Sequence, residues 1–173
     1  TIDEQAVSLS AILAAFEVGE DQTASADTLT DAAEEFGLIT SGQAHVYMVS
    51  GQGTILSVQT ESQFRSVEVS LDGYDGPTRV FLYTGPRVPS DDTSVRDAVG
   101  FISFGDFEDQ TQYGRVAAVI NRKIIAEILE PLDVDSLPGR EIQFRGAFSI
   151  RTFNLVEIDL SAVYVIPTFI DVR

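Results

Sequence analysis

The segment GFISFGDFEDQTQYGR, residues 100–115, gathers the side chains of this chain that most resemble a binding site. Its aromatic and acidic members are Phe101, Phe104, Asp106, Phe107, Glu108, Asp109 and Tyr113. Rings with nearby acids suit the stacking and hydroxyl hydrogen bonding of a polar ligand, so one interpretation is an aromatic pocket rimmed with acid. The spacing of three between the phenylalanines equally suits a turn or short 3₁₀ segment that plugs a core, where each buried ring contributes roughly 2 to 3 kcal/mol. From the residues alone we favour the core plug.

Catalytic chemistry has little support elsewhere. His45 is the only histidine, it opens a predicted strand, and no Gly-x-Ser-x-Gly motif accompanies it, so we expect a structural or surface role. Pairs of carboxylates are uninformative because 27 acids produce them by chance. The acidic runs around residues 106–109 and 133–135 lack the ligand set of a calcium-binding EF-hand loop, and the chain has no cysteine. We therefore predict no enzyme activity, no metal and no cofactor.

The charge balance limits the possible partners. Eleven basic against 27 acidic residues give a net charge of −16, which repels a nucleic-acid backbone within a screening length of roughly 8 to 10 Å. Nucleic acid is excluded as a partner. No apolar run approaches the roughly 18 residues needed to span a bilayer. The sequence therefore predicts no membrane-spanning segment.

Helical periodicity occurs in three places. In residues 6–16 the apolar side chains recur at i, i+3, i+4 and i+7, which predicts a short helix. Residues 25–37 predict a second helix, with Ser25 as its N-cap and Gly37 as its terminator. A longer apolar stripe predicts a helix from about Gln112 to Leu129, and a brief helical stretch precedes it near residue 94.

The sequence pattern predicts five strands, at residues 45–59, 67–71, 79–83, 140–150 and 155–166. The resulting order of three strands, a helical connection and two strands is that of a five-stranded OB-fold barrel. In such a barrel the first strand must curve, and Gly51 and Gly53 relieve that strain. The alternative is that SGQG, residues 50–53, makes a hairpin in a six-stranded meander or sandwich.

We therefore predict an α+β protein, mainly β: an OB-like barrel with a long helix between its third and fourth strands and two short N-terminal helices. The predicted organisation is one domain, residues 1–173. Residues 1–40 form its helical N-terminal segment, and residues 41–173 form the barrel with a helical insertion at about 93–131.

One long string resembles a known family. TSVRDAVGFISFGDFEDQTQYGRVAAVIN at 93–121, with VFLYTGP before it and LPGREIQFRGAFSI and YVIP after it, is similar to a bacterial family of predicted periplasmic lipoproteins of unknown function. The similarity runs from about Val7 to the end of the chain. The positions that match the family motif are Arg96, Asp97, Phe101, Phe104, Phe107, Gln110 and Tyr113.

The resemblance implies export, a lipid anchor on the outer face of the inner membrane, and genes beside sugar ABC transporters. This chain departs from the family in having no lipobox cysteine, and in carrying Asp109 where an amide is expected. We expect that an anchor segment has been removed. The family has no established catalytic residues, so the matching positions mark a ligand or partner site only. In structural terms, we expect Arg96 to pair with Asp97 or with backbone carbonyls, and Gln110 to cap the helix start.

Three functions follow from these observations. The leading prediction is a non-enzymatic, exported accessory protein that contacts an envelope protein such as a component of a solute transporter. The alternative is a module that binds a sugar-like molecule against Tyr83, Phe104, Phe107 or Tyr113. An acid-dependent hydrolase is the least supported, because the sequence does not supply the required geometry of two carboxylates.

Overall fold

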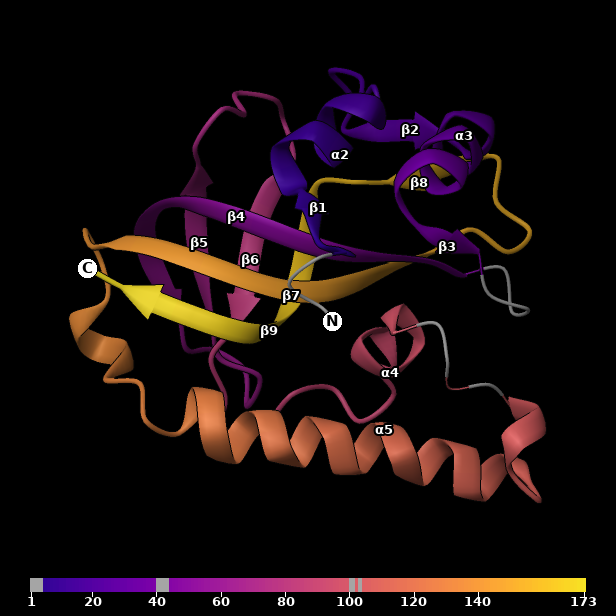
Figure 1. Cartoon of the computed structure of the whole chain (residues 1–173). Helices are drawn as coiled ribbons and strands as arrows, with labels where there is room; N and C mark the ends of the chain where they lie inside the picture. Colours follow the sequence, from indigo (N-terminus) through magenta and orange to yellow (C-terminus); the bar gives the residue numbers. More distant parts are fainter. Residues whose placement is uncertain (1–4, 40–43, 100–101, 103) are drawn as a thin grey trace.

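Five strands form the centre of the protein in the computed structural model, which describes residues 5–39, 44–99, 102 and 104–173. They are β4 (Ala44–Gln59), β5 (Ser66–Leu71), β6 (Arg79–Tyr83), β7 (Glu141–Arg151) and β9 (Ala162–Val172). They pair in the order β4-β5-β6-β9-β7, and β7 pairs again with β4, so the strands close into a ring (Figure 1). These pairs are antiparallel except β6 with β9, which is parallel. The predicted α+β class is confirmed, and three strands, helices and two strands follow one another as expected.

The first strand of the ring, β4, runs without a turn through Gly51 and Gly53. It pairs with β7 along its first part and with β5 along its second, and both neighbours meet it at Gly53. A side chain at Gly51 would lie 2.5 Å from the Phe144 ring, and one at Gly53 would collide with the backbone oxygen of Ser70. Glycine is needed here because neighbouring chains approach the strand closely. The hairpin alternative for residues 50–53 is wrong.

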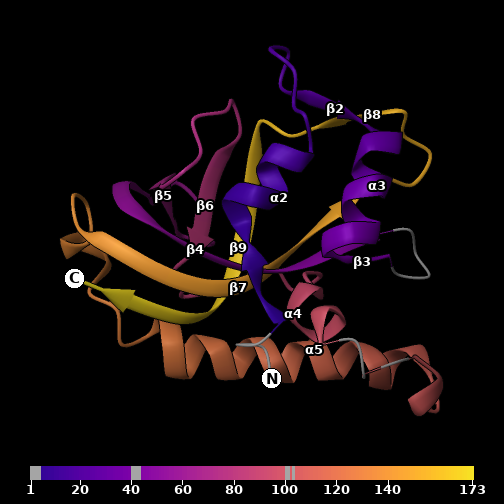
Figure 2. The same ribbon diagram turned by 45° about the horizontal axis from the view of Figure 1, so that its top comes forward.

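Two helices, α2 (Leu9–Ala15) and α3 (Ala26–Phe36), cover one end of the ring (Figures 1 and 2). Ser25 caps α3 as predicted, since its Oγ accepts a hydrogen bond from the backbone N–H of Thr28 at 3.2 Å. The predicted apolar faces of both helices are buried in one core together with side chains from inside the ring. The largest fully buried side chains of this core are Phe16, Tyr47, Phe144 and Phe148.

A second core lies on the outside of the ring, under the helical insertion. The insertion contains α4 (Ser94–Ala98) and α5 (Gln110–Ile124), which continues as a π-helical turn from Ile125 to Leu129. Figure 1 shows α5 running beneath β7 and β9. The core joins Val46, Met48, Val88, Val95, Ala98, Ile124, Leu129, Ala147 and Ile166. The predicted long helix is thus confirmed, with a start two residues earlier and a wider last turn.

Short strands tie the N-terminal helices to the ring. β1 (Val7–Ser8) and β3 (Leu38–Ile39) pair with β4, and β2 (Thr23–Ser25) pairs with β8 (Glu157–Asp159). The single strand predicted over residues 155–166 is therefore wrong, because β8 belongs to a separate two-stranded sheet and β9 begins only at Ala162. Two 3₁₀ turns, η1 (Phe104–Asp106) and η3 (Val134–Ser136), lie in the connections.

The helices leave one side of the ring uncovered. Figures 1 and 2 show α2 and α3 over one end of the ring and α5 under β7 and β9, whereas no helix in the described part of the chain lies over β5 and β6. Among the described residues, no helix is long and apolar enough to cross a membrane.

Candidate functional site

Arg96, Asp97 and Tyr113 of the family motif come together where α4 meets the start of α5, and they bind one another. Arg96 and Asp97 form an ion pair of 2.7 Å between Nη2 and Oδ1, and Arg96 Nη1 donates to the backbone oxygen of Tyr113 at 3.1 Å. The Tyr113 hydroxyl donates to Asp97 Oδ1 at 3.2 Å, and Thr93 Oγ1 donates to Asp97 Oδ2 at 2.7 Å. Arg96 is only 6% exposed. Because charge-assisted bonds between side chains of the cluster satisfy these groups, the cluster fastens α4 to α5.

Phe104 and Phe107 lie at the edge of this cluster and do not plug the ring. The ring centres of Phe104 and Phe107 are 5.7 Å and 5.6 Å from that of Tyr113. Phe104 is 53% exposed, so the predicted core plug is wrong. The physical reason is that α2 and α3 fill the end of the ring, while η1 and α5 lie outside it. The 3₁₀ turn expected from the spacing is present, and Phe101 lies outside the described residues.

Gln110 is the first residue of α5, and its side chain is exposed. The helix is capped by Asp109 instead, whose Oδ1 accepts a hydrogen bond from the backbone N–H of Gln112 at 2.8 Å. The predicted capping role of Gln110 is wrong, because the short aspartate side chain reaches the free N–H groups of the first turn better.

His45 lies inside the protein, 3% exposed, on β4. Burial lowers the pKa of its imidazole from the ordinary value of 6.5. No described residue bonds its Nδ1, and the same holds for the hydroxyl of Tyr47 two residues further on. Within the described ranges, no group of three or more histidine, aspartate or glutamate side chains is placed to hold a metal ion.

The uncovered side of the ring carries a row of stacked aromatic rings. The ring centre of Tyr164 lies 4.9 Å from that of Phe81 and 5.5 Å from that of Tyr83, with the planes inclined by 12° and 28°. The guanidinium of Arg79 lies 5.0 Å from the centre of Phe81 and pairs with Glu68 at 2.7 Å. Phe81 is therefore covered, at 3% exposed, whereas Tyr164 is 44% exposed. Tyr164 is thus a solvent-exposed ring of this row.

Two adjoining hollows flank this row. One, of about 390 Å³, is bounded by the loop between β4 and β5, and the other, of about 300 Å³, by β8 and the residues that follow it. Both are lined by Tyr83 and Tyr164, so the exposed tyrosine lies where they meet. The polar side chains in their walls are Gln59, Glu61, Ser62, Ser66, Arg79, Asp92, Ser149, Arg151 and Asp159. Each hollow has the size of a small-ligand pocket.

The electrostatics of this face favour a neutral ligand. Burial, and then the neighbouring Asp92 carboxylate, raises the pKa of Tyr83 far above 10.0, so its phenol stays protonated. Burial also raises the pKa of Asp92, whose Oδ1 accepts a hydrogen bond from the backbone N–H of Ser94 at 3.0 Å. At the rim, Arg151 pairs with Asp91 at 3.6 Å. The phenol of Tyr83 is thus neutral, and both acids and arginines stand in the walls around it.

The sequence predicted Tyr83 as a ligand contact but did not predict Tyr164. The signal was present in AVYVIP, where a tyrosine stands between two valines of a strand. Because successive side chains of a strand point to opposite faces, the buried Val163 and Val165 place Tyr164 on the outside.

Comparison with solved structures supports the fold. The crystal structure of an OB-fold protein from Thermotoga maritima superposes with a TM-score of 0.68 over 99% of this chain and 88% of that chain, at 14% sequence identity. Identity this low shows the fold alone. No curated protein matches the chain. The family model described as "Predicted periplasmic lipoprotein (DUF2291)" matches residues 2–171, so the chain belongs to this family of predicted periplasmic lipoproteins, as the segment around residues 93–121 indicated.

Proposed function

We propose that the protein is a non-enzymatic binding module that holds a neutral saccharide chain across the uncovered face of the ring. The observation that carries this proposal is Tyr164, which is 44% exposed, stacks against Phe81 and Tyr83, and lines both hollows. A flat aromatic ring contacts the apolar face of a sugar unit, and the polar walls of the hollows bond the hydroxyls of the units before and after it.

The position of this face within the ring supports the proposal. In OB-folds, ligands bind to the face of the second and third strands, between the loops that follow the first and fourth strands. Here β5 and β6 are the second and third strands of the ring, and the two hollows adjoin the corresponding loops. OB-folds bind oligonucleotides or oligosaccharides, and the net charge of −16 disfavours the oligonucleotide.

The absence of enzyme activity is part of the proposal. Three carboxylates near the rings are engaged in structural contacts: Glu68 with Arg79, Asp91 with Arg151 and Asp92 with the backbone of Ser94. The Arg79 contact also lowers the pKa of Glu68, which keeps this group ionised. A general acid needs a proton to give near neutral pH, and the ionised Glu68 does not hold one, so its pairing with Arg79 fits binding better than hydrolysis.

Titration of the protein with neutral linear tetrasaccharides, namely maltotetraose, cellotetraose and fully N-acetylated chitotetraose, tests the proposal by calorimetry. Binding of one of them is expected, and Tyr164→Ala should weaken it about tenfold, or about 1.4 kcal/mol. Phe104→Ala is the matched control, because it removes another exposed aromatic ring far from both hollows. Failure of all three sugars to bind, or an equal loss in the control, would contradict the proposal.

A second candidate function is an accessory role on an envelope protein, such as a component of a solute transporter. The favouring observation is the loop between β7 and β8, where Phe153, Leu155 and Val156 are 62%, 50% and 79% exposed. The loop is joined to α3, since the N–H of Ala26 donates to the oxygen of Val156 at 2.8 Å. α3 carries four exposed acids, namely Asp27, Asp31, Glu34 and Glu35. An apolar cleft with a basic rim would complement this end of the molecule.

A photo-crosslinking residue at position 156, used in the native envelope with the lipid-anchored protein, tests this role. The expected product is a crosslink to one transporter subunit that disappears in a Phe153→Ser variant and weakens at high salt. Crosslinks to lipid alone, or to many proteins without preference, would contradict it.

A further inference from the structure

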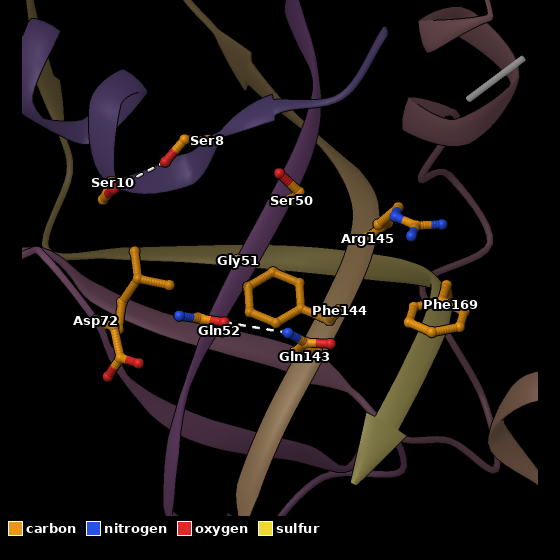
Figure 3. Close-up of a pocket in the computed structure, with 11 residues that line it drawn as sticks. Ser8, Ser10, Ser50, Gly51, Gln52, Asp72, Gln143, Phe144, Arg145 and Phe169 are labelled. Atoms are coloured by element: carbon orange, nitrogen blue, oxygen red, sulfur yellow. Dashed lines mark hydrogen bonds between the residues drawn. The ribbon is translucent and has the colours of Figure 1, made fainter. Parts of the chain in front are cut away.

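A third pocket lies where β4 leaves β1 and begins to pair with β5. Its volume is about 450 Å³, and Figure 3 shows its walls: the start of α2, the middle of β4 and the adjoining part of β7. It shares no lining residue with the two hollows at Tyr164. A ligand here would therefore bind independently of the proposed saccharide face.

Three polar groups line the pocket without a hydrogen-bond partner among the described residues. They are the hydroxyl of Ser50, the amide nitrogen of Gln52 and the carboxylate of Asp72. The other end of the Gln52 amide is fixed, because its Oε1 accepts a hydrogen bond from Gln143 Nε2 at 3.1 Å. Figure 3 shows the Gln52 nitrogen turned toward the side on which Asp72 lies. The backbone N–H of Asp72 donates to the backbone oxygen of Gln52 at 2.9 Å, so the donor and the acceptor belong to neighbouring residues of the pocket wall.

The pocket carries no net charge of its own. Asp72 is its acid and Arg145 its base, and the guanidinium of Arg145 lies over the Phe169 ring, 4.7 Å from the ring centre. Serine hydroxyls at its other wall, Ser8 and Ser10, bond each other at 2.8 Å and can both donate and accept. An ionic ligand would gain nothing from this balance.

We propose that this pocket binds a compact, uncharged polyol. A pair of neighbouring hydroxyls matches the wall, since one hydroxyl donates to the Asp72 carboxylate while the next accepts from the Gln52 amide. The partly exposed ring of Phe169 supplies apolar surface for the carbon skeleton. A smaller hollow of about 250 Å³ adjoins the pocket at Gln52, Asp72 and Gln143, which leaves room for a substituent.

Chemical-shift titration with myo-inositol and D-glucose tests this site, with glucose 6-phosphate as the charged comparator. At least one neutral probe is expected to shift the amide signals of Ser50, Gln52 and Asp72, and the phosphate should bind about tenfold more weakly. The double variant Gln52→Ala, Asp72→Ala should weaken the neutral probe at least tenfold. Both side chains are exposed, so the core is unaffected.

Two further measurements separate this site from the saccharide face. Ser50→Leu fills the pocket and should abolish the same shifts, while Tyr164→Ala should leave them unchanged. The proposal is overturned when neither neutral probe moves these signals, when the phosphate binds more tightly than glucose, or when Tyr164→Ala removes the shifts. Binding of a tetrasaccharide at Tyr164 does not depend on any of these results.

Discussion

The guanidinium carbon of Arg96 lies 3.6 Å from the centre of the Tyr113 ring, and the same side chain donates to the backbone oxygen of Tyr113 at 3.1 Å. One residue of α4 therefore holds the first turn of α5 through both a cation–π contact and a hydrogen bond. Asp97 completes the cluster, with its side chain 12% exposed against 7% for Arg96. Side chains of the family motif thus hold the two helices of the insertion, α4 and α5, together.

Arg96→Met should destabilise the protein by about 2 to 4 kcal/mol in urea denaturation, because it leaves the Asp97 carboxylate largely buried without its cation. Tyr113→Phe removes only the hydroxyl bond to Asp97 and should cost about 1 kcal/mol. The control is Arg115→Ala, an exposed position of α5, for which a change under about 0.5 kcal/mol is expected. Equal effects at Arg96 and Arg115 would show that the cluster does not hold the helices.

Phe104→Ala should lower the free energy of unfolding by less than about 1 kcal/mol, because half of this ring already faces solvent. Phe144→Ala is the matched comparison: this ring is 1% exposed inside the β ring, and its loss should cost about 3 to 5 kcal/mol. Thermal and urea unfolding of both variants checks the difference. A large loss at position 104 would restore the core-plug interpretation.

Local patterns allowed the helices and the curvature of β4 to be predicted. Apolar spacing and a serine cap define α3. The two glycines of β4 mark a strand that bends and that neighbouring chains approach closely. These features depend on residues that are near one another in the chain. They can therefore be predicted from local sequence patterns.

Other features depend on distant partners. β8 exists because it pairs with β2, a contact that joins Thr23 to Asp159, and no local pattern indicates it. The row of rings at Tyr164 likewise requires the parallel pairing of β6 with β9, which sets Phe81 opposite Tyr164. The candidate site could therefore be predicted only in part, through Tyr83.

Gly53→Ala should be strongly destabilising, because the added methyl group would collide with the backbone oxygen of Ser70 on the paired strand. Overpacking of this kind costs about 1 to 3 kcal/mol, and the backbone cannot move without breaking a sheet pairing. Gly114→Ala is the control within the same chain. It lies in α5 with no atom within 4 Å of the new methyl group, and should stabilise by about 0.5 to 1 kcal/mol. In urea denaturation, the free energy of unfolding should fall for Gly53→Ala and rise for Gly114→Ala. A Gly53→Ala variant as stable as the wild type would contradict the close approach of the Ser70 backbone to Gly53.

The last prediction concerns pH and His45. Burial lowers the pKa of this imidazole in the folded protein below its ordinary value of 6.5, so the unfolded chain binds a proton more readily. The resulting stabilisation is fully present above pH 6.5 and is lost as pH falls from 6.5 toward the folded pKa, with a slope of at most about 1.4 kcal/mol per pH unit. Urea denaturation of the wild type and of His45→Gln between about pH 5.5 and pH 8 isolates this contribution, because His45 is the only histidine and the carboxylates common to both proteins cancel in the difference. We expect the wild type to lose stability relative to the variant as pH falls below 6.5. A difference that stays constant across this range would show that the imidazole is protonated as readily inside the protein as in water.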